Sequence, residues 1–122
     1  MNKLTVYTYA QCDTCRKAVK WLKEQGIAFE ERPIRETPPT ISELRSVFVA
    51  NGSVLRKLFN TSGRDYREQK LGEKLPEMTE TAAFRLLLGN GNLVKRPFVV
   101  GSGVGLVGFD AKRWAEQLVR RR

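Results

Sequence analysis

In the first third of the chain the hydrophobic pattern changes from one typical of a strand to one typical of a helix and back. Residues 4–8 are short, β-branched and aromatic, which predicts a strand. In residues 14–26 the apolar positions recur on one helical face, and the closing glycine is typical of a helix end. Residues 27–34 predict a second strand, although its proline cannot donate a ladder hydrogen bond. The order strand, helix, strand within about 30 residues predicts a parallel βαβ unit.

The middle of the chain predicts helices separated by turns. After two consecutive prolines, Thr40 and Glu43 form a capping-box pattern ahead of a helix that ends near Asn51. Residues 54–59 predict one or two further helical turns, and residues 79–88 predict another helix. One segment between them carries turn residues without periodicity, namely Asn60, Thr61, Ser62 and Gly63.

The last part of the chain predicts a hairpin followed by a helix. Residues 97–100 and 104–109 are strand-like and are joined by a short Gly-rich connection, which favours an antiparallel pair. Asp110 is a suitable N-cap for a final helix, and residues 120–122 would place arginines at its carboxyl end. We expect its inward side chains to be Ala111, Trp114, Leu118 and Val119.

These elements run βαβ, then helices, then ββα, which predicts an α/β thioredoxin-like fold. The length of 122 residues and the 41% hydrophobic content fit one domain with a single core. We expect that domain to span residues 1–122, with a helical insertion between its two halves at roughly residues 38–92.

Charge and hydropathy bear on which partners the protein binds and where in the cell it is found. The formal net charge is +9, but the positive residues are spread along the chain, so direct nucleic-acid binding is not expected. The N-terminus lacks the apolar run of a signal peptide, and no segment approaches the ~20 apolar residues of a membrane span. We expect a cytoplasmic monomer that does not associate with membranes.

The chain contains two cysteines and no histidine. The absence of histidine excludes Ser-His and Cys-His catalytic pairs. It also argues against a mononuclear zinc site, because two thiols alone would need carboxylates to complete the ligand set. We therefore expect no metal. In the cytosol, two nearby cysteines are more often catalytic or redox-active than structural.

Cys12 and Cys15 lie where the first strand ends and the first helix begins. Free N–H groups and the positive end of the helix dipole stabilise a thiolate there, and the following Arg16 and Lys17 would add to this effect. Cys15 lies about one turn further on, close enough to form a disulfide with Cys12. This arrangement predicts an attacking thiolate at Cys12 and a resolving thiol at Cys15. The alternatives are half of a zinc knuckle, or two cysteines that only fill the core.

Five segments of the chain, in this order, carry a resemblance to a known protein family: YTYAQCDTCRKAVKWLKEQGI, TPPTISELRSVF, KLFNTSGRDYRE, LVKRPFVV and GLVGFD. They are distributed between residues 7 and 110, and over essentially its whole length the chain resembles the arsenate reductase family, including its Spx-type regulators that bind RNA polymerase. The CxxC loop and the FNTSG stretch are most similar to a small bacterial branch of that family. The resemblance implies a cis bond between Arg96 and Pro97, facing the cysteine loop, with the arginine directed at the reactive thiol.

Departures from the family pattern bear on the substrate. Arsenate-reducing members keep one cysteine in the loop and gather three arginines around the oxyanion. In this chain Asn60, Thr61 and Ser62 stand where one such arginine would lie, and Gly108 lies near the position of another. We expect Arg64 to substitute in space for the missing charge. We expect the catalytic residues to be Cys12, Cys15 and Arg96. The expected substrate-binding residues are Arg16, Asn60, Thr61, Ser62, Arg64 and Pro97.

Two functions of different classes follow. The first is a cytosolic thiol–disulfide oxidoreductase acting on a small thiol or disulfide, without a bound cofactor, with glutathione, a glutaredoxin or a thioredoxin as reductant. The second is a redox-sensing transcriptional regulator that binds RNA polymerase. Arsenate reduction is a less favoured third. Multiple turnovers with a reductant would distinguish the enzyme from the regulator.

Overall fold

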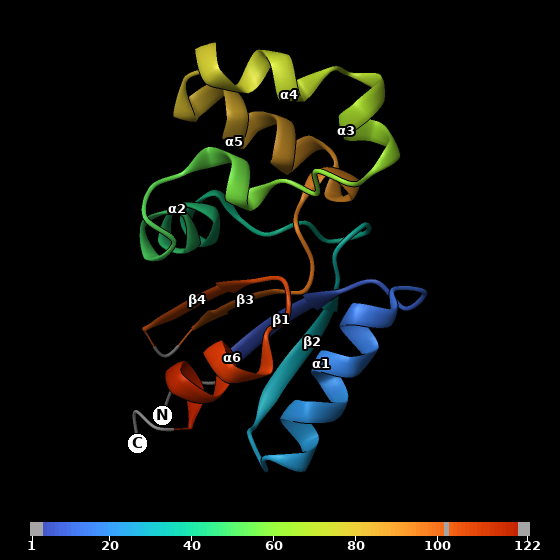
Figure 1. Cartoon of the computed structure of the whole chain (residues 1–122), viewed down its shortest axis with the longest axis vertical. Helices are drawn as coiled ribbons and strands as arrows, with labels where there is room; N and C mark the ends of the chain where they lie inside the picture. The colour runs from blue at the N-terminus through green and yellow to red at the C-terminus, as the bar shows by residue number, and fades with distance from the viewer. Residues whose placement is uncertain (1–3, 102, 120–122) are drawn as a thin grey trace.

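The computed structural model describes residues 4–101 and 103–119, and Figure 1 shows it as a sheet with helices on both faces. The elements run β1 (Leu4–Thr8), α1 (Asp13–Glu24), β2 (Phe29–Pro33), α2 (Ile41–Ala50), η1 (Leu55–Leu58), α3 (Arg64–Glu68), α4 (Leu71–Lys74), η2 (Leu75–Glu77), α5 (Glu80–Gly89), η3 (Gly91–Leu93), β3 (Phe98–Gly101), β4 (Val104–Val107) and α6 (Ala111–Leu118).

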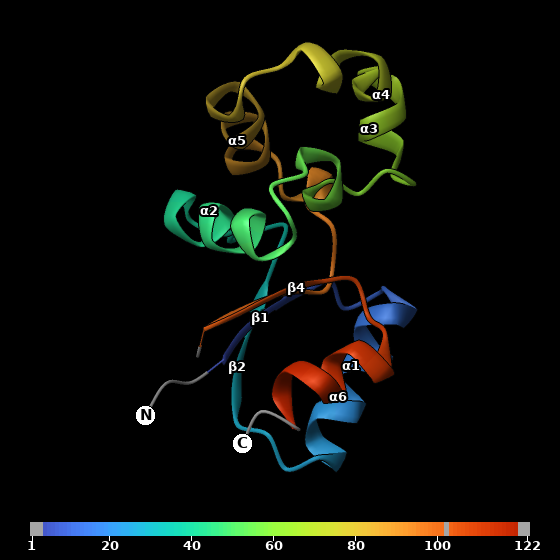
Figure 2. The same cartoon turned by 60° about the vertical axis from the view of Figure 1, so that its left-hand side comes forward.

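The sheet has the strand order β2-β1-β3-β4. β1 pairs in parallel with β2 and antiparallel with β3, and β3 pairs antiparallel with β4. α1 and α6 cover one face of the sheet, and the helices between β2 and β3 lie beyond the other face (Figures 1 and 2). This topology confirms the thioredoxin-like α/β fold expected from the order of the elements. We call residues 41–93 the helical insert.

Most elements appear where the hydrophobic pattern predicted them. The capping box at Thr40 and Glu43 forms with both hydrogen bonds present, so α2 begins as expected. The strands predicted over 27–34 and 104–109 are both shorter in the structure. Ala111 was expected to face inward and is exposed, because it occupies the outer side of the first turn of α6. The arginines at 120–122 lie outside the described residues.

The helices α3 and α4 were not predicted. They are five and four residues long, too short to show a helical periodicity. Each contributes one buried side chain to the insert, Tyr66 from α3 and Leu71 from α4. Tertiary packing of these two side chains therefore accounts for helical turns that the local sequence does not predict.

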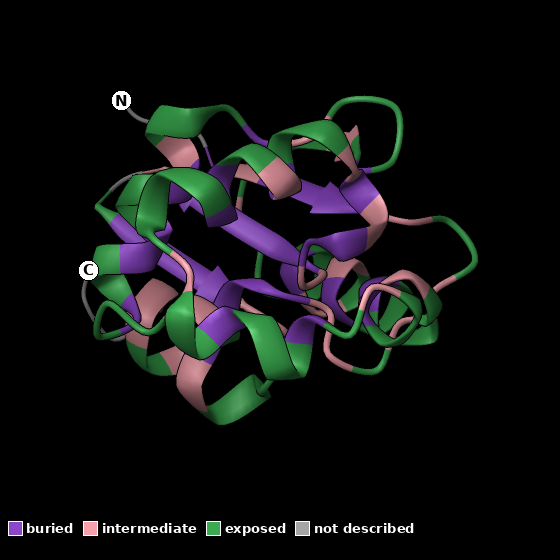
Figure 3. Cartoon of the chain, turned by 90° about the horizontal axis from the view of Figure 1, so that it is seen from above, coloured by how far each residue is buried: buried purple, intermediate pink, exposed green. Residues whose placement is uncertain are grey.

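The sheet separates two hydrophobic clusters, and its strands are largely buried (Figure 3). Alternate side chains of each strand point to opposite faces, so Val6 and Val99 pack under α1 and α6, while Tyr7 and Phe98 pack toward the insert. Trp114 of α6 is 1% exposed and closes the first cluster. Ala18 and Leu22 of α1 and Trp114 of α6 are thus buried as the apolar spacing predicted, whereas Val19, Leu118 and Val119 are half-buried.

Two glycines allow the insert to approach the sheet closely. A Cβ at Gly91 would lie 2.0 Å from the carbonyl oxygen of Ile34, at the end of β2. A Cβ at Gly105 would lie 3.0 Å from the Cα of Val47 and 2.9 Å from the Cβ of Ala50, both on α2. Any side chain at either position would force backbone to move. These contacts hold η3 beside the carboxyl end of β2, where the functional site forms.

Within the described residues, no helix has the length and apolarity required to cross a membrane.

Candidate functional site

Cys12 is the N-cap residue of α1, at the point where the chain leaves β1. Its backbone is extended, and its own N–H donates to the Tyr9 carbonyl at 3.0 Å. Its sulfur accepts a hydrogen bond from the backbone N–H of Cys15, at 3.4 Å. The Cys12 side chain is half-buried, whereas Cys15 is buried, and both are free thiols. The sulfur of Cys12 therefore takes the place that a serine or aspartate oxygen occupies at other helix starts.

The environment separates the acidities of the two thiols. Partial burial of Cys12 opposes ionisation, but hydrogen bonds from Cys15 and the charge of Arg96 outweigh it, and the pKa of Cys12 lies below its ordinary value. Burial is the main cause that raises the pKa of Cys15 to about 12, and the adjacent Cys12 sulfur adds to the rise. The thiolate therefore forms more readily at Cys12 than at Cys15.

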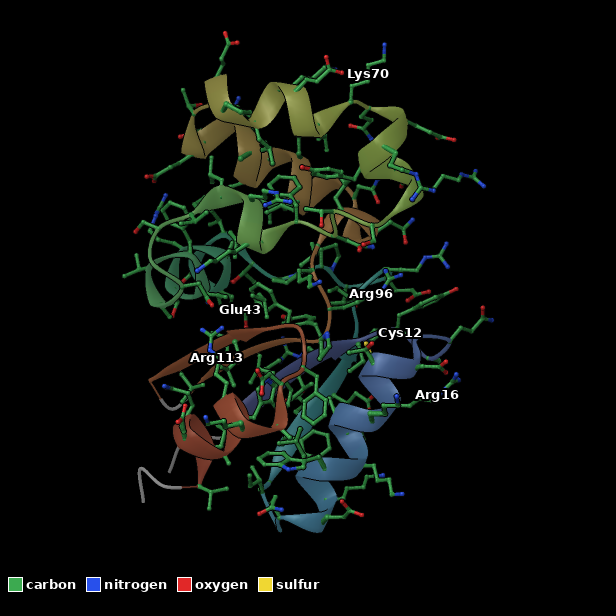
Figure 4. The ribbon with its side chains drawn as sticks, in the orientation of Figure 1. Cys12, Arg16, Glu43, Lys70, Arg96 and Arg113 are labelled. Carbon is green, nitrogen blue, oxygen red and sulfur yellow. The ribbon has the colours of Figure 1, made fainter. Side chains whose placement is uncertain are left out.

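Arg96 provides the positive charge next to Cys12. It lies in the loop before β3, and the Arg96–Pro97 peptide bond is cis. Figure 4 shows Arg96 beside Cys12, between the sheet and the helical insert. The Arg96 guanidinium carbon is 4.8 Å from the centre of the Tyr9 ring. Its Nη1 atom is buried and has no hydrogen-bond partner among the described residues. A buried guanidinium nitrogen without an acceptor is a ready position for an anionic group.

A polar cleft of about 410 Å³ opens beside Arg96. It lies between the carboxyl end of β2 and the insert. Backbone hydrogen bonds fix its wall, since the Asn60 N–H donates to the Leu93 carbonyl at 2.7 Å and the Gly63 N–H donates to the Asn60 carbonyl at 3.0 Å. The lining residues are Tyr9, Arg35, Asn60, Gly63, Arg64, Asp65, Asn92 and Arg96.

Three arginines thus line one cleft, and they differ in how far other side chains already engage them. Arg35 donates to the Tyr9 hydroxyl at 3.0 Å. Arg64 is largely exposed and contacts Glu68 at 3.4 Å, so part of its charge is already paired. The Asp65 carboxylate accepts from Asn90 at 2.8 Å, and this hydrogen bond is the main cause that holds its pKa below the usual range. The cleft therefore keeps a positive excess.

The other residues expected to bind substrate lie elsewhere. Arg16 is ion-paired with Asp13 and donates to the Ala10 carbonyl at 2.9 Å, and Figure 4 shows it on the outer side of α1. It borders a separate groove of about 530 Å³ on the Cys15 side of α1. Thr61 faces a different depression, of about 400 Å³, bordered by Lys95 and Arg113.

Ser62 and Pro97 form hydrogen bonds within the protein through their backbone carbonyls. The Ser62 carbonyl accepts from Arg67 at 2.8 Å, while its side chain is exposed. Pro97 is buried, and its carbonyl accepts the Gly108 N–H at 2.9 Å. Of the expected substrate-binding residues, the structure therefore brings Asn60 and Arg64 into the cleft with Arg96. The other four, Arg16, Thr61, Ser62 and Pro97, do not line it.

Sequence analysis overlooked Arg35 and Tyr9. Both directly follow strands of the parallel pair, Tyr9 after β1 and Arg35 one residue beyond the buried Ile34. Carboxyl ends of parallel strands meet at one edge of a sheet, so their position next to the cysteine loop was available from topology. The described residues contain no group of three or more cysteine or acidic side chains that could hold a metal ion.

Comparison with known proteins gives this site its context. Residues 7–117 match the model of the ArsC family. The protein YusI of Bacillus subtilis is 44% identical over 93% of this chain and 96% of its own length. The global transcriptional regulator Spx of Enterococcus faecalis is 33% identical over 88% of this chain and 80% of its own.

A solved structure agrees. The crystal structure of a putative ArsC family related protein from Bacteroides fragilis superposes with a TM-score of 0.87, at 45% identity, covering 93% of this chain and 96% of that one. The family match extends over both cysteines and over Arg96 and the hairpin that follows it. The chain therefore belongs to the ArsC family.

Proposed function

We propose that this protein is a cytoplasmic thiol–disulfide oxidoreductase in which Cys12 attacks a disulfide and Cys15 resolves the product. One observation carries the proposal. A half-buried sulfur at a helix N-cap faces the Arg96 guanidinium, and a second, buried thiol lies one turn further on. The N-cap hydrogen bond and the guanidinium both favour the thiolate, which is the nucleophilic form.

In the first step the Cys12 thiolate attacks one sulfur of a disulfide substrate. A new S–S bond joins Cys12 to half of the substrate, the substrate S–S bond breaks, and the other half leaves as a thiolate that takes a proton from water. Arg96 loses the charge of Cys12 in this step, so its guanidinium becomes available to the departing sulfur or to another anionic group of the substrate.

In the second step Cys15 attacks the Cys12 sulfur. The negative charge of Cys12 has gone, which removes one of the causes that raise the pKa of Cys15. Cys15 gives up its proton, the Cys12–Cys15 disulfide forms, and the second half of the substrate leaves as a thiol. Two electrons have passed from the protein to the substrate. Glutathione, a glutaredoxin or a thioredoxin then reduces the protein disulfide by the same exchange chemistry.

The test is turnover. Purified protein is incubated with a disulfide substrate, glutathione, glutathione reductase and NADPH, and NADPH consumption is followed over many equivalents of protein. A second set uses thioredoxin and its reductase. We expect activity that is lost in Cys12→Ser and reduced in Cys15→Ser. A Cys15→Ser protein should also retain substrate thiols as mixed disulfides on Cys12, which mass spectrometry detects. Activity that survives Cys12→Ser would contradict the proposal.

A redox-sensing regulator that binds RNA polymerase is the second candidate, and the similarity to Spx supports it. In that case the Cys12–Cys15 disulfide would change affinity for the polymerase, with no multiple turnover. Binding of the reduced and oxidised protein to RNA polymerase, measured beside the turnover assay, separates the two. Arsenate is included as a third substrate, with glutathione and glutaredoxin, and we expect little reduction of it.

A further inference from the structure

The Tyr9 ring contacts two positively charged side chains. The guanidinium carbon of Arg96 is 4.8 Å from the centre of its ring, and that of Arg35 is 5.0 Å from the same centre. Arg35 also donates to the Tyr9 hydroxyl at 3.0 Å. Two guanidinium groups that approach one another repel, and the electron-rich face of an aromatic ring offsets part of that repulsion. Tyr9 therefore holds Arg35 and Arg96 together at one edge of the cleft.

Protein carboxylates offset only part of the charge of this pair. Among the described residues, neither Arg35 nor Arg96 forms an ion pair. Asp65 lines the same cleft, and its carboxylate charge acts on Arg35, but Arg64 lines the cleft as well, so three arginines share it with one carboxylate. The Nη1 atom of Arg96 has no acceptor, and both arginines line the cleft that adjoins the reactive sulfur.

We propose that Arg35 and Arg96, held by Tyr9, bind a carboxylate of the substrate, so that the substrate class is a small disulfide with carboxylates close to its sulfurs. A planar carboxylate matches the forked donors of a guanidinium, and Arg96 lies next to Cys12. A carboxylate held there places the neighbouring disulfide near the Cys12 sulfur. Arg35 is a binding residue in this scheme and Tyr9 is a positioning residue. The inference rests on Cys12 as the reactive thiol of the proposed function.

The experiment compares two disulfides of similar size, each under single-turnover conditions with fully reduced protein. Dithiodipropionate carries two carboxylates, and bis(hydroxyethyl) disulfide carries none. The measured quantity is the ratio of their second-order rate constants with Cys12. In Arg35→Gln this ratio should fall by roughly three- to tenfold, the effect of one partly exposed charge-assisted contact. Arg56→Gln removes the same charge from the exposed helix η1 and should leave the ratio unchanged.

Two Tyr9 variants test the positioning role. Tyr9→Phe keeps the ring beneath both guanidinium groups and removes only the hydroxyl, so it should retain most of the preference for the anionic disulfide. Tyr9→Leu removes the ring and should lower the ratio as far as Arg35→Gln does. Circular dichroism and thermal melting confirm that both variants fold.

The outcomes separate this inference from the proposed function. The inference is overturned if Arg35→Gln and Arg56→Gln give the same ratio, or if the wild type reacts with both disulfides in proportion to their reactivity with a free thiol. Either result leaves turnover intact. A protein that shows the charge preference in single reactions but no turnover would instead contradict the proposed enzyme and support the binding site.

Discussion

The backbone N–H of Cys15 is directed at the sulfur of Cys12, 3.4 Å away, so the helix that carries the second cysteine stabilises the thiolate of the first. The same turn buries the Cys15 side chain against the sheet, at 1% exposure. One piece of local geometry therefore lowers the pKa of Cys12 and raises that of its partner. The resulting asymmetry can be measured directly.

Alkylation should distinguish the two thiols. A short pulse of iodoacetamide at about pH 6–7, followed by peptide mass spectrometry, should modify Cys12 well before Cys15, because only the thiolate reacts at a useful rate. Cys15 should become reactive only at alkaline pH, in line with its pKa of about 12, or after denaturation. Equal labelling of both residues in the folded protein would be inconsistent with the assigned roles.

Arg96→Gln should raise the pKa of Cys12 with little effect on stability. The substitution removes a positive charge that favours the thiolate, and alkylation of Cys12 at neutral pH should slow by roughly three- to tenfold. Unfolding should change little, since the Nη1 atom of Arg96 has no hydrogen-bond partner to lose. Arg56→Gln is the matched control. A large loss of stability with an unchanged Cys12 pKa would make Arg96 a structural residue.

Asn51 should be important for stability and not for thiol reactivity. It is 3% exposed, its amide donates to the Val47 carbonyl at 2.7 Å and the Gly105 carbonyl at 3.2 Å, and its oxygen accepts from Arg113 at 2.7 Å. These bonds join α2, β4 and α6. Asn51→Ala should lower the free energy of unfolding by about 2–3 kcal/mol, measured by urea denaturation. Lys112→Ala, exposed on α6, should have almost no effect.

Tyr7 should make stability fall at alkaline pH. Burial, together with the hydrogen bond to Glu43 at 2.6 Å, raises the pKa of Tyr7 to about 12. The unfolded chain ionises near the ordinary value of ~10, so the stabilisation is present in full below about pH 10 and is lost as the pH rises toward 12.

The measurement is urea unfolding of the wild type and Tyr7→Phe as a function of pH. The stability advantage of the wild type over Tyr7→Phe should be constant at neutral pH and should shrink by up to about 2 kcal/mol between pH ~10 and ~12. An advantage that does not change over this interval would show that Tyr7 ionises equally in both states. Comparing the two proteins cancels the titration of Cys15 and the lysines.

The helices and strands that are specified by residues close together in the chain could be predicted from the sequence. The apolar spacing around Ala18 and Leu22 predicted α1, and Thr40 with Glu43 predicted the start of α2, because a capping box satisfies backbone groups only three residues apart. The short helices α3 and α4 could not be predicted in this way. Asp65 of α3 is held by Asn90, 25 residues away in sequence, and no local pattern records such a contact.

The same distinction applies to the site. By itself, the sequence determined that Cys12 and Cys15 lie at a helix start one turn apart, because a strand-to-helix transition and a three-residue spacing are local properties of the chain. The family resemblance led us to expect Arg96 at the sulfur, and only the tertiary structure decided which other charged side chains lie near it. Arg35 follows β2, Arg96 precedes β3, and Tyr9 joins them because parallel pairing brings the ends of β1 and β2 to one edge. Arg16 and Lys17 are neighbours of Cys12 in sequence, yet Arg16 is paired with Asp13, and Arg96 provides the positive charge at the thiolate.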